Sequence, residues 1–141
     1  MSDANRALVN LMIEQIQNRK NIGLVDELFS EDFLNHTVLP GIASDRNGMR
    51  ALFSMFHTAF PDGVVTVEDQ ISSDDKVWTR KFFSGTHTGP FRSIAPTGNR
   101  VTYTVVDILG IRCGKMVDHW SLIDRLPFLQ QLGLYAAGLG G

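Results

Sequence analysis

Apolar side chains recur at helical spacing in the first part of the chain and alternate with polar ones in the second part. A first helix is predicted from a cap at Ser2 or Asp3 to a stop before Gly23, on an apolar stripe of Val9, Met12, Ile13 and Ile16. Residues 24–29 indicate a short second helix. The clearest helix covers residues 45–60, because one face carries Met49, Leu52, Phe53, Phe56 and Phe60.

Beyond the breaker Pro61-Asp62-Gly63 the pattern changes to that of β-strands, rich in β-branched and aromatic residues. Four strands are predicted, over residues 64–72, 77–88, 101–112 and 115–123. A last short helix is predicted over residues 124–133, with Asp124 as its cap. The tail after Gly133 is expected to be loosely ordered.

Helices followed by antiparallel strands are typical of an α+β fold. We predict a single domain over residues 1–141, in which the helices cover one face of a strongly curved sheet. A half-closed sheet of this kind can enclose a pocket.

Composition and charge exclude several classes of function. The chain is 43% hydrophobic and 20% charged, with a net charge of −2 and no cluster of Lys and Arg, so no nucleic-acid partner is expected. With one cysteine, Cys113, no signal peptide and no apolar run long enough to span a membrane, we expect a cytoplasmic protein. No metal or cofactor is expected, since the sequence has no phosphate-binding Gly loop and its histidines are scattered: His36, His57, His87 and His119.

One position breaks the alternation of the last two strands. Between residues 101 and 112 the odd positions are apolar or aromatic except for Asp107. A carboxylate on an apolar strand face is costly to bury without a partner. Asp107 is therefore either a catalytic group of an enclosed pocket or one half of a purely structural buried pair.

The partner of Asp107 depends on the turn at Cys113-Gly114. A two-residue turn places Asp107 opposite Trp120. A three-residue loop with a Gly bulge places Asp107 opposite His119, and puts Ser121 on the same face. We favour the second register, because it forms a carboxylate–imidazole pair suited to moving a proton next to a carbonyl group.

Three segments resemble the SnoaL-like polyketide cyclases of the NTF2-like superfamily. They are Gly85-Thr86-His87-Thr88-Gly89-Pro90-Phe91, Gly114-Lys115-Met116-Val117-Asp118-His119-Trp120 and Phe33-Leu34-Asn35-His36. The resemblance implies a conical α+β barrel with a deep pocket, a homodimer formed through the outer sheet face, and ring closure by aldol condensation without a cofactor. It also implies a polar role for Asn35. The family's supporting His falls on Asp107, and its catalytic Asp falls on Ser121, so this chain departs from the family pattern.

Other residues are weaker candidates for binding substrate. Arg80 and Trp78 share one strand face, and Arg80 would either bind an anion in the pocket or lie in a surface pair. Tyr103 is expected in the pocket wall, Ser121 as a small residue that widens the pocket, and His36 either in the pocket or on the surface. We expect His87 to fix its loop by hydrogen bonding, and His57 to be exposed.

The leading hypothesis is a cofactor-independent cyclase or isomerase that acts through an enolate of a small hydrophobic carbonyl compound, of polyketide or terpenoid type. Asp107 would be the base, His119 its partner and Asn35 a polar anchor. The alternatives are an epoxide or ester hydrolase using the same pocket, and a non-catalytic small-molecule-binding domain, because a fold alone does not fix a function.

Overall fold

The computed structural model describes residues 2–134, so the prediction for the tail lies largely outside the described residues. The helical elements are α1 (Ser2–Met12), its π-helical continuation η1 (Ile13–Asn18), the 3₁₀ turn η2 (Ile22–Leu24), α2 (Val25–Leu28), α3 (Arg46–Ala59) and α4 (Arg125–Gln131). The strands are β1 (Phe29–Asn35), β2 (Val64–Ser73), β3 (Lys76–Thr86), β4 (Arg100–Arg112) and β5 (Lys115–Ile123).

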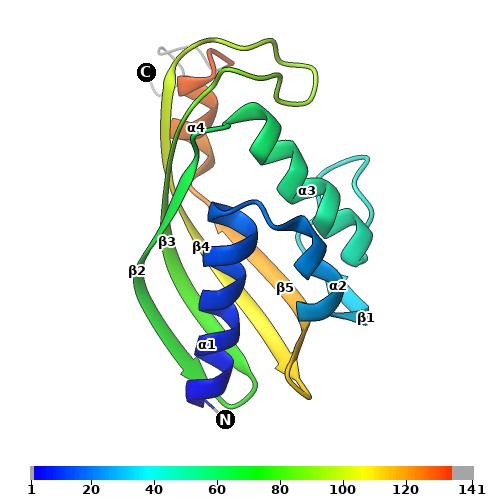
Figure 1. The fold of residues 1–141 in the computed structure, drawn as a ribbon. Helices are drawn as coiled ribbons and strands as arrows, with labels where there is room; N and C mark the ends of the chain where they lie inside the picture. The colour runs from blue at the N-terminus through cyan, green and yellow to red at the C-terminus, as the bar shows by residue number, and fades with distance from the viewer. Residues whose placement is uncertain (1, 135–141) are drawn as a thin grey trace.

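The five strands form one curved sheet in the order β1-β5-β4-β3-β2. All neighbours are antiparallel except β1 and β5, which run parallel. Helices α1 and α3 lie across one face of the sheet, and α4 closes one end beside the loop between β3 and β4 (Figure 1). The predicted α+β fold is confirmed, and its curvature leaves space between the helices and the sheet.

The hairpin between β4 and β5 differs from both predicted registers. Cys113 and Gly114 have φ of 53° and 72°, so they form the tight two-residue turn in which both central residues are left-handed. The three-residue loop was therefore the wrong choice. Val117 is an extra residue in β5, because Ile111 pairs with Met116 but Gly110 pairs with Asp118. This bulge places Asp107 opposite Ser121, and neither His119 nor Trp120 as predicted.

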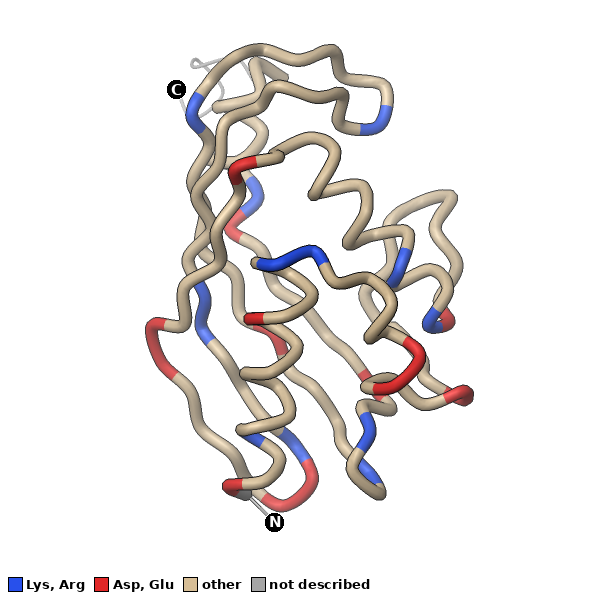
Figure 2. The backbone as a smooth tube through the Cα atoms, viewed as in Figure 1, with Lys and Arg blue, Asp and Glu red and all other residues tan. Residues whose placement is uncertain are grey.

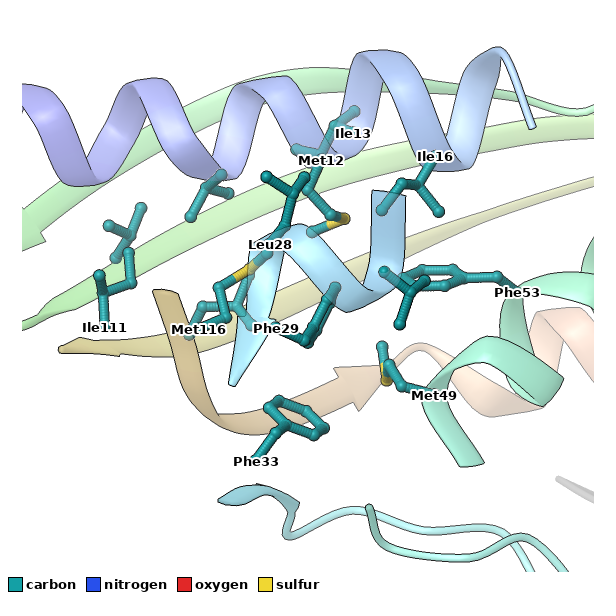
Figure 3. Packing of buried hydrophobic residues seen from close by; sticks show 14 residues of the cluster. Met12, Ile13, Ile16, Leu28, Phe29, Phe33, Met49, Phe53, Ile111 and Met116 are labelled. Atoms are coloured by element: carbon teal, nitrogen blue, oxygen red, sulfur yellow. The ribbon is translucent and has the colours of Figure 1, made fainter. Parts of the chain in front are cut away.

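The core consists of two apolar clusters. The first packs α1, η1, α2 and α3 against β1 and against the ends of β4 and β5 next to their hairpin turn. In this cluster the ring centroids of Phe29 and Phe33 lie 4.9 Å apart in an edge-to-face arrangement (Figure 3). The second is mainly aromatic and joins β3, β4 and α4, where the rings of Phe83 and Tyr103 stack at 4.8 Å. The predicted stripe of the first helix is buried in the first cluster. Asp107 lies on β4 between Val105 of the second cluster and Leu109 of the first.

Lys and Arg are spread over the described part of the chain, and Asp and Glu lie among them (Figure 2). No helix within residues 2–134 is long and apolar enough to cross a membrane. The outer face of the sheet instead exposes large apolar side chains, among them Ile71, Trp78 and Leu122. This apolar outer face is separate from the interior space that the helices cover.

Candidate functional site

A row of polar side chains crosses the inner face of the sheet between the two core clusters. It consists of Gln17 from η1, Lys81 from β3, Asp107 from β4, His119 from β5 and Asn35 from β1. We call these five residues the polar layer. Lys81 is 2% exposed, Asp107 7% and His119 5%, so three ionisable groups are removed from water together. Burial of such groups requires mutual pairing.

Asp107 has a basic partner on each carboxylate oxygen. Lys81 forms an ion pair with Oδ2, and Nε2 of His119 lies 3.0 Å from Oδ1. Lys81 also donates to Oε1 of Gln17 at 3.1 Å, and Nδ1 of His119 lies 2.9 Å from Oδ1 of Asn35. His119 and Asp107 come from diagonal positions on β5 and β4, which long side chains can bridge. The polar layer is thus one continuous hydrogen-bonded chain.

Both ring nitrogens of His119 lie within hydrogen-bond distance of an oxygen atom. The backbone N–H of Thr37 donates to Oδ1 of Asn35 at 3.1 Å, so that atom is an acceptor. The carboxylate of Asp107 is also an acceptor. A protonated imidazole satisfies this arrangement by donating from both nitrogens.

Opposing effects act on the carboxyl group of Asp107. Burial raises its pKa, but the charges of Lys81 and His119, together with the hydrogen bonds that both donate, outweigh burial. The pKa of Asp107 is held well below its ordinary value of 3.8. Asp107 is therefore an ionised and weakly basic group. Its more evident role is to pair with Lys81 and His119 and so to hold both side chains in place.

Asp107 and His119 face an inner cavity of about 120 Å³ between α3 and the sheet. Its other polar lining comes from Gln17, His57, Tyr103 and Ser121, and the rest of the wall is largely apolar and aromatic. Burial, and then the charge of Asp107, raise the pKa of Tyr103, so its hydroxyl stays protonated. The cavity joins an apolar wall to a small set of convergent polar groups, as ligand sites commonly do.

An outer chamber of about 410 Å³ adjoins the inner cavity. The two share the walls formed by Leu52, Phe56, His119, Ser121 and Ile123. The outer chamber extends between the loop after β1, the loop after β3 and helix α4, where it is lined by residues such as Leu39, Phe91 and Phe128. His119 lies at the junction, so a ligand that fills the outer chamber can present one end to its imidazole ring.

The structure brings together some of the predicted binding residues and separates others. Tyr103 and Ser121 line the inner cavity, and Asn35 contacts His119 from behind the wall. Trp78 and Arg80 lie on the outer face of the sheet, outside the cavity, although both were candidates for binding substrate. Arg80 pairs with Glu68 at 3.0 Å, which is the surface pair considered as its alternative. His36 also lies outside the cavity. Its Nε2 is 2.8 Å from Oδ1 of Asp118, and its ring stacks on that of Trp120 with the ring centroids 4.4 Å apart.

Two features of the site did not come from the sequence. Lys81 was missed, although it takes the inward strand position that Arg80 was considered for. His57 was predicted to be exposed, but it is half-buried, lines the inner cavity and donates to the backbone oxygen of Gln17 at 3.1 Å. Burial lowers its pKa despite that hydrogen bond. The expectation for His87 is confirmed, since its Nδ1 bonds both the backbone N–H and the hydroxyl of Thr97.

The described residues contain no group of three or more His, Cys, Asp or Glu side chains placed to hold a metal ion. The polar layer has only two such ligands in contact, Asp107 and His119, and Lys81 occupies the other carboxylate oxygen. The arrangement is suited to moving a proton and to stabilising negative charge on a ligand oxygen.

Comparison with known proteins gives a consistent picture. The chain resembles TsrD from Streptomyces laurentii, with a TM-score of 0.84 and 25% identity over 94% of this chain and 97% of TsrD. AclR from Streptomyces galilaeus, named as a candidate hydroxylase, has a TM-score of 0.82 and 30% identity over 94% of this chain and 86% of AclR. IdmH from Streptomyces antibioticus, named as a candidate polyketide cyclase, has a TM-score of 0.78 and 28% identity over 92% of this chain and 98% of IdmH.

No match is found among curated proteins. The family model of the SnoaL-like polyketide cyclases, in contrast, matches residues 7–132, which is nearly the whole of the described chain. With the conical sheet, the enclosed cavity and this match, the chain belongs to the SnoaL-like polyketide cyclase family.

Proposed function

We propose that this protein is an enzyme that cyclises or isomerises a hydrophobic 1,3-dicarbonyl compound through its enol or enolate. The observation that supports this most is the imidazole of His119, held between Asp107 and Asn35 at the wall of an apolar cavity. The family and the similarity to IdmH, named as a candidate polyketide cyclase, point to the same substrate class.

The low pKa of Asp107 shifts the roles expected from the sequence. A strongly stabilised carboxylate is a weak base, so the main contribution falls to His119 as the acid that donates to a carbonyl oxygen. The carboxylate of Asp107 accepts the proton of the carbon between two carbonyl groups, which releases its hydrogen bond with Nε2 of His119. The electrons of that C–H bond form a C=C bond, and those of the carbonyl π bond move to the carbonyl oxygen.

In isomerisation this enolate oxygen takes a proton from His119. In cyclisation the enolate carbon instead attacks a second carbonyl, the first carbonyl re-forms, and the new alkoxide oxygen takes the proton from His119. Transfer of the proton from Asp107 to His119 restores the starting state.

The weak basicity of Asp107 is also the reason for proposing a 1,3-dicarbonyl compound as the substrate. A weak base can remove a proton only from a carbon acid that is already activated, and a carbon between two carbonyl groups meets that requirement. Positive charge aimed at the oxygen where negative charge develops is the usual large electrostatic contribution to such reactions. The imidazolium of His119 and the charge of Lys81 behind Asp107 supply it.

The proposal is tested with benzoylacetone, an apolar aromatic 1,3-diketone whose keto and enol forms differ in ultraviolet absorption. A solution of the enol is diluted into buffer with and without the protein, and the approach to equilibrium is followed. We expect the protein to accelerate the interconversion in proportion to its concentration. A rate equal to that in buffer, with benzoylacetone bound, would contradict a catalytic role.

One observation favours a second candidate, a binding protein without turnover. The hydrogen-bonding groups of Asp107, His119 and Asn35 described above already have partners within the protein, so the layer is also complete as a structural element. Binding of benzoylacetone without acceleration would support this candidate. Epoxide hydrolysis has less support, because Asp107 is the only carboxylate among the described residues of either chamber and Arg80 lies outside.

We also propose that two copies of the chain associate through the apolar outer face of the sheet. Leu122 is 74% exposed there, beside Trp78 and a surface hollow lined by Ile108 and Trp120. Exposed apolar clusters of this kind commonly mark protein interfaces. This face bears none of the residues of the polar layer, so the association leaves the cavity intact.

The substitution Leu122→Glu is expected to raise the dimer dissociation constant by at least about tenfold, because it buries a charge in the apolar interface. Sedimentation equilibrium measures this constant directly. The matched control is Leu11→Glu, since Leu11 is a half-exposed leucine on helix α1. A wild-type protein that is monomeric at micromolar concentration, or equal effects of the two variants, would refute the interface.

A further inference from the structure

Two arginines at the outer chamber differ from the rest. The other arginines of the described chain each lie within ion-pair distance of an Asp or Glu: Arg6, Arg19, Arg46, Arg50, Arg80, Arg100 and Arg112. Within residues 2–134 no such ion pair is formed by Arg92 or Arg125, and both line the outer chamber. Both arginines without a carboxylate partner in this part of the chain therefore line the outer chamber.

Arg92 also occupies an unfavourable backbone position. Its φ of 54° is left-handed, a conformation that glycine adopts freely and that an L residue with a Cβ adopts at a cost. The turn is closed by reciprocal backbone hydrogen bonds between Phe91 and Ile94, at 2.9 and 2.8 Å. The guanidinium donates to the backbone oxygen of Pro40 in the loop across the chamber. A strained arginine at a ligand chamber indicates a role for its side chain.

The chamber concentrates positive charge in apolar surroundings. No Asp or Glu is among its lining residues within the described chain, and its walls include Leu39, Phe91 and Phe128. The protein as a whole has a net charge of −2, so this local excess does not follow from its composition. A guanidinium is a planar donor that matches a carboxylate, and both arginines are exposed and so accessible to a ligand.

We propose that the outer chamber binds a carboxylate of the substrate through Arg92 and Arg125. The inference deepens the proposed function: the substrate would carry an acid group at one end and present its reacting carbonyl to His119, which lines both chambers. The apolar skeleton between the two groups would lie along Leu52, Phe56 and Ile123, the walls that the chambers share.

The test compares 2-naphthoate with its neutral methyl ester by isothermal titration calorimetry. Neither compound has an enolisable carbonyl, so the result is independent of the proposed reaction. We expect the wild-type protein to bind the acid about tenfold more tightly than the ester, as for a charge-assisted hydrogen bond. In the double variant Arg92→Asn/Arg125→Gln the preference is lost while the affinity for the ester stays within about twofold, because the apolar walls are unchanged.

Asparagine is chosen at residue 92 because it tolerates a left-handed backbone, so the turn is kept. Arg80→Gln is the matched control: this arginine lies on the outer face of the sheet and should leave the preference intact. Equal affinity of the wild-type protein for acid and ester would overturn the proposal. So would a preference that survives in the double variant, or failure of the wild-type protein to bind either compound.

Discussion

Replacing Lys81 with methionine is expected to lower the free energy of unfolding by about 3–5 kcal/mol, because the change leaves a buried carboxylate without its main cation. Methionine keeps the length of the side chain and adds no polar atom. Asp107 would retain His119 as a single partner, and Oε1 of Gln17 would lose the hydrogen bond that Lys81 donates. Urea unfolding at pH 7 measures the difference.

The neighbouring arginine supplies the control. Arg80 lies one residue earlier on the same strand, where it is half-exposed and paired with Glu68 at 3.0 Å. Arg80→Met should therefore lower the free energy of unfolding by less than about 1 kcal/mol. Adding Asp107→Asn to Lys81→Met should recover part of the stability, since the unpaired charge is then removed. Similar losses from Lys81→Met and Arg80→Met would show that the ion pair of Asp107 contributes little.

The effect of Lys81→Met should also shrink in acid. The pKa of Asp107 is lower in the folded protein than its ordinary value of 3.8, so its contribution to stability is present above pH 3.8 and is lost as the pH falls through the folded value. The variant lacks the cation that mainly depresses this pKa, so it has less of that contribution to lose. The free energies of unfolding of the two proteins should therefore differ by a similar amount from pH 7 down to pH 3.8, and approach each other only as the pH falls below 3.8.

Replacing His119 with glutamine is expected to slow the enzyme-dependent interconversion of benzoylacetone by about 10²- to 10⁴-fold, the range typical of a lost acid–base group. Glutamine can still donate one hydrogen bond and accept another, but it cannot transfer a proton. The loss should fall on the rate at saturation, because the apolar walls that bind the diketone are unchanged. Initial rates at increasing benzoylacetone concentration separate the two effects.

Ser121→Ala is the matched control for this variant. Ser121 lines the same two chambers as His119, but no side-chain contact joins it to the polar layer. Its replacement should change the rate by no more than a few-fold. A His119→Gln variant with the wild-type rate would assign the acceleration to another cavity residue, such as His57.

The sequence predicted the α+β order, the curved sheet and the inward position of Asp107, because these follow from alternation along long strands. It also placed His119 and Ser121 on the same face as Asp107, although by the wrong register. Strand β1 could not be found this way. It is short, lies at the edge of the sheet, and its burial follows no simple alternation.

Lys81 could not be inferred because both faces of β3 carry bulky apolar residues. Val77 and Phe83 share the face of Lys81, while Trp78 and Phe82 share that of Arg80, so alternation alone does not tell the inside from the outside. The register settles the question, since Lys81 pairs with Val105, a buried residue of β4. The ion pair with Asp107 depends on contacts between strands, which local patterns do not contain.

The extra residue Val117 has a consequence for how this protein can change. Deleting Val117 would leave Ile111 paired with Met116 and Gly110 paired with Asp118, so the ladder would become regular and the rest of β5 would keep its register. His119 and Ser121 would still face the cavity, but each would lie one residue nearer to the turn along the sequence. Homologues without this bulge should therefore place their reactive residues at positions shifted by one, and alignments that ignore it would equate the wrong side chains.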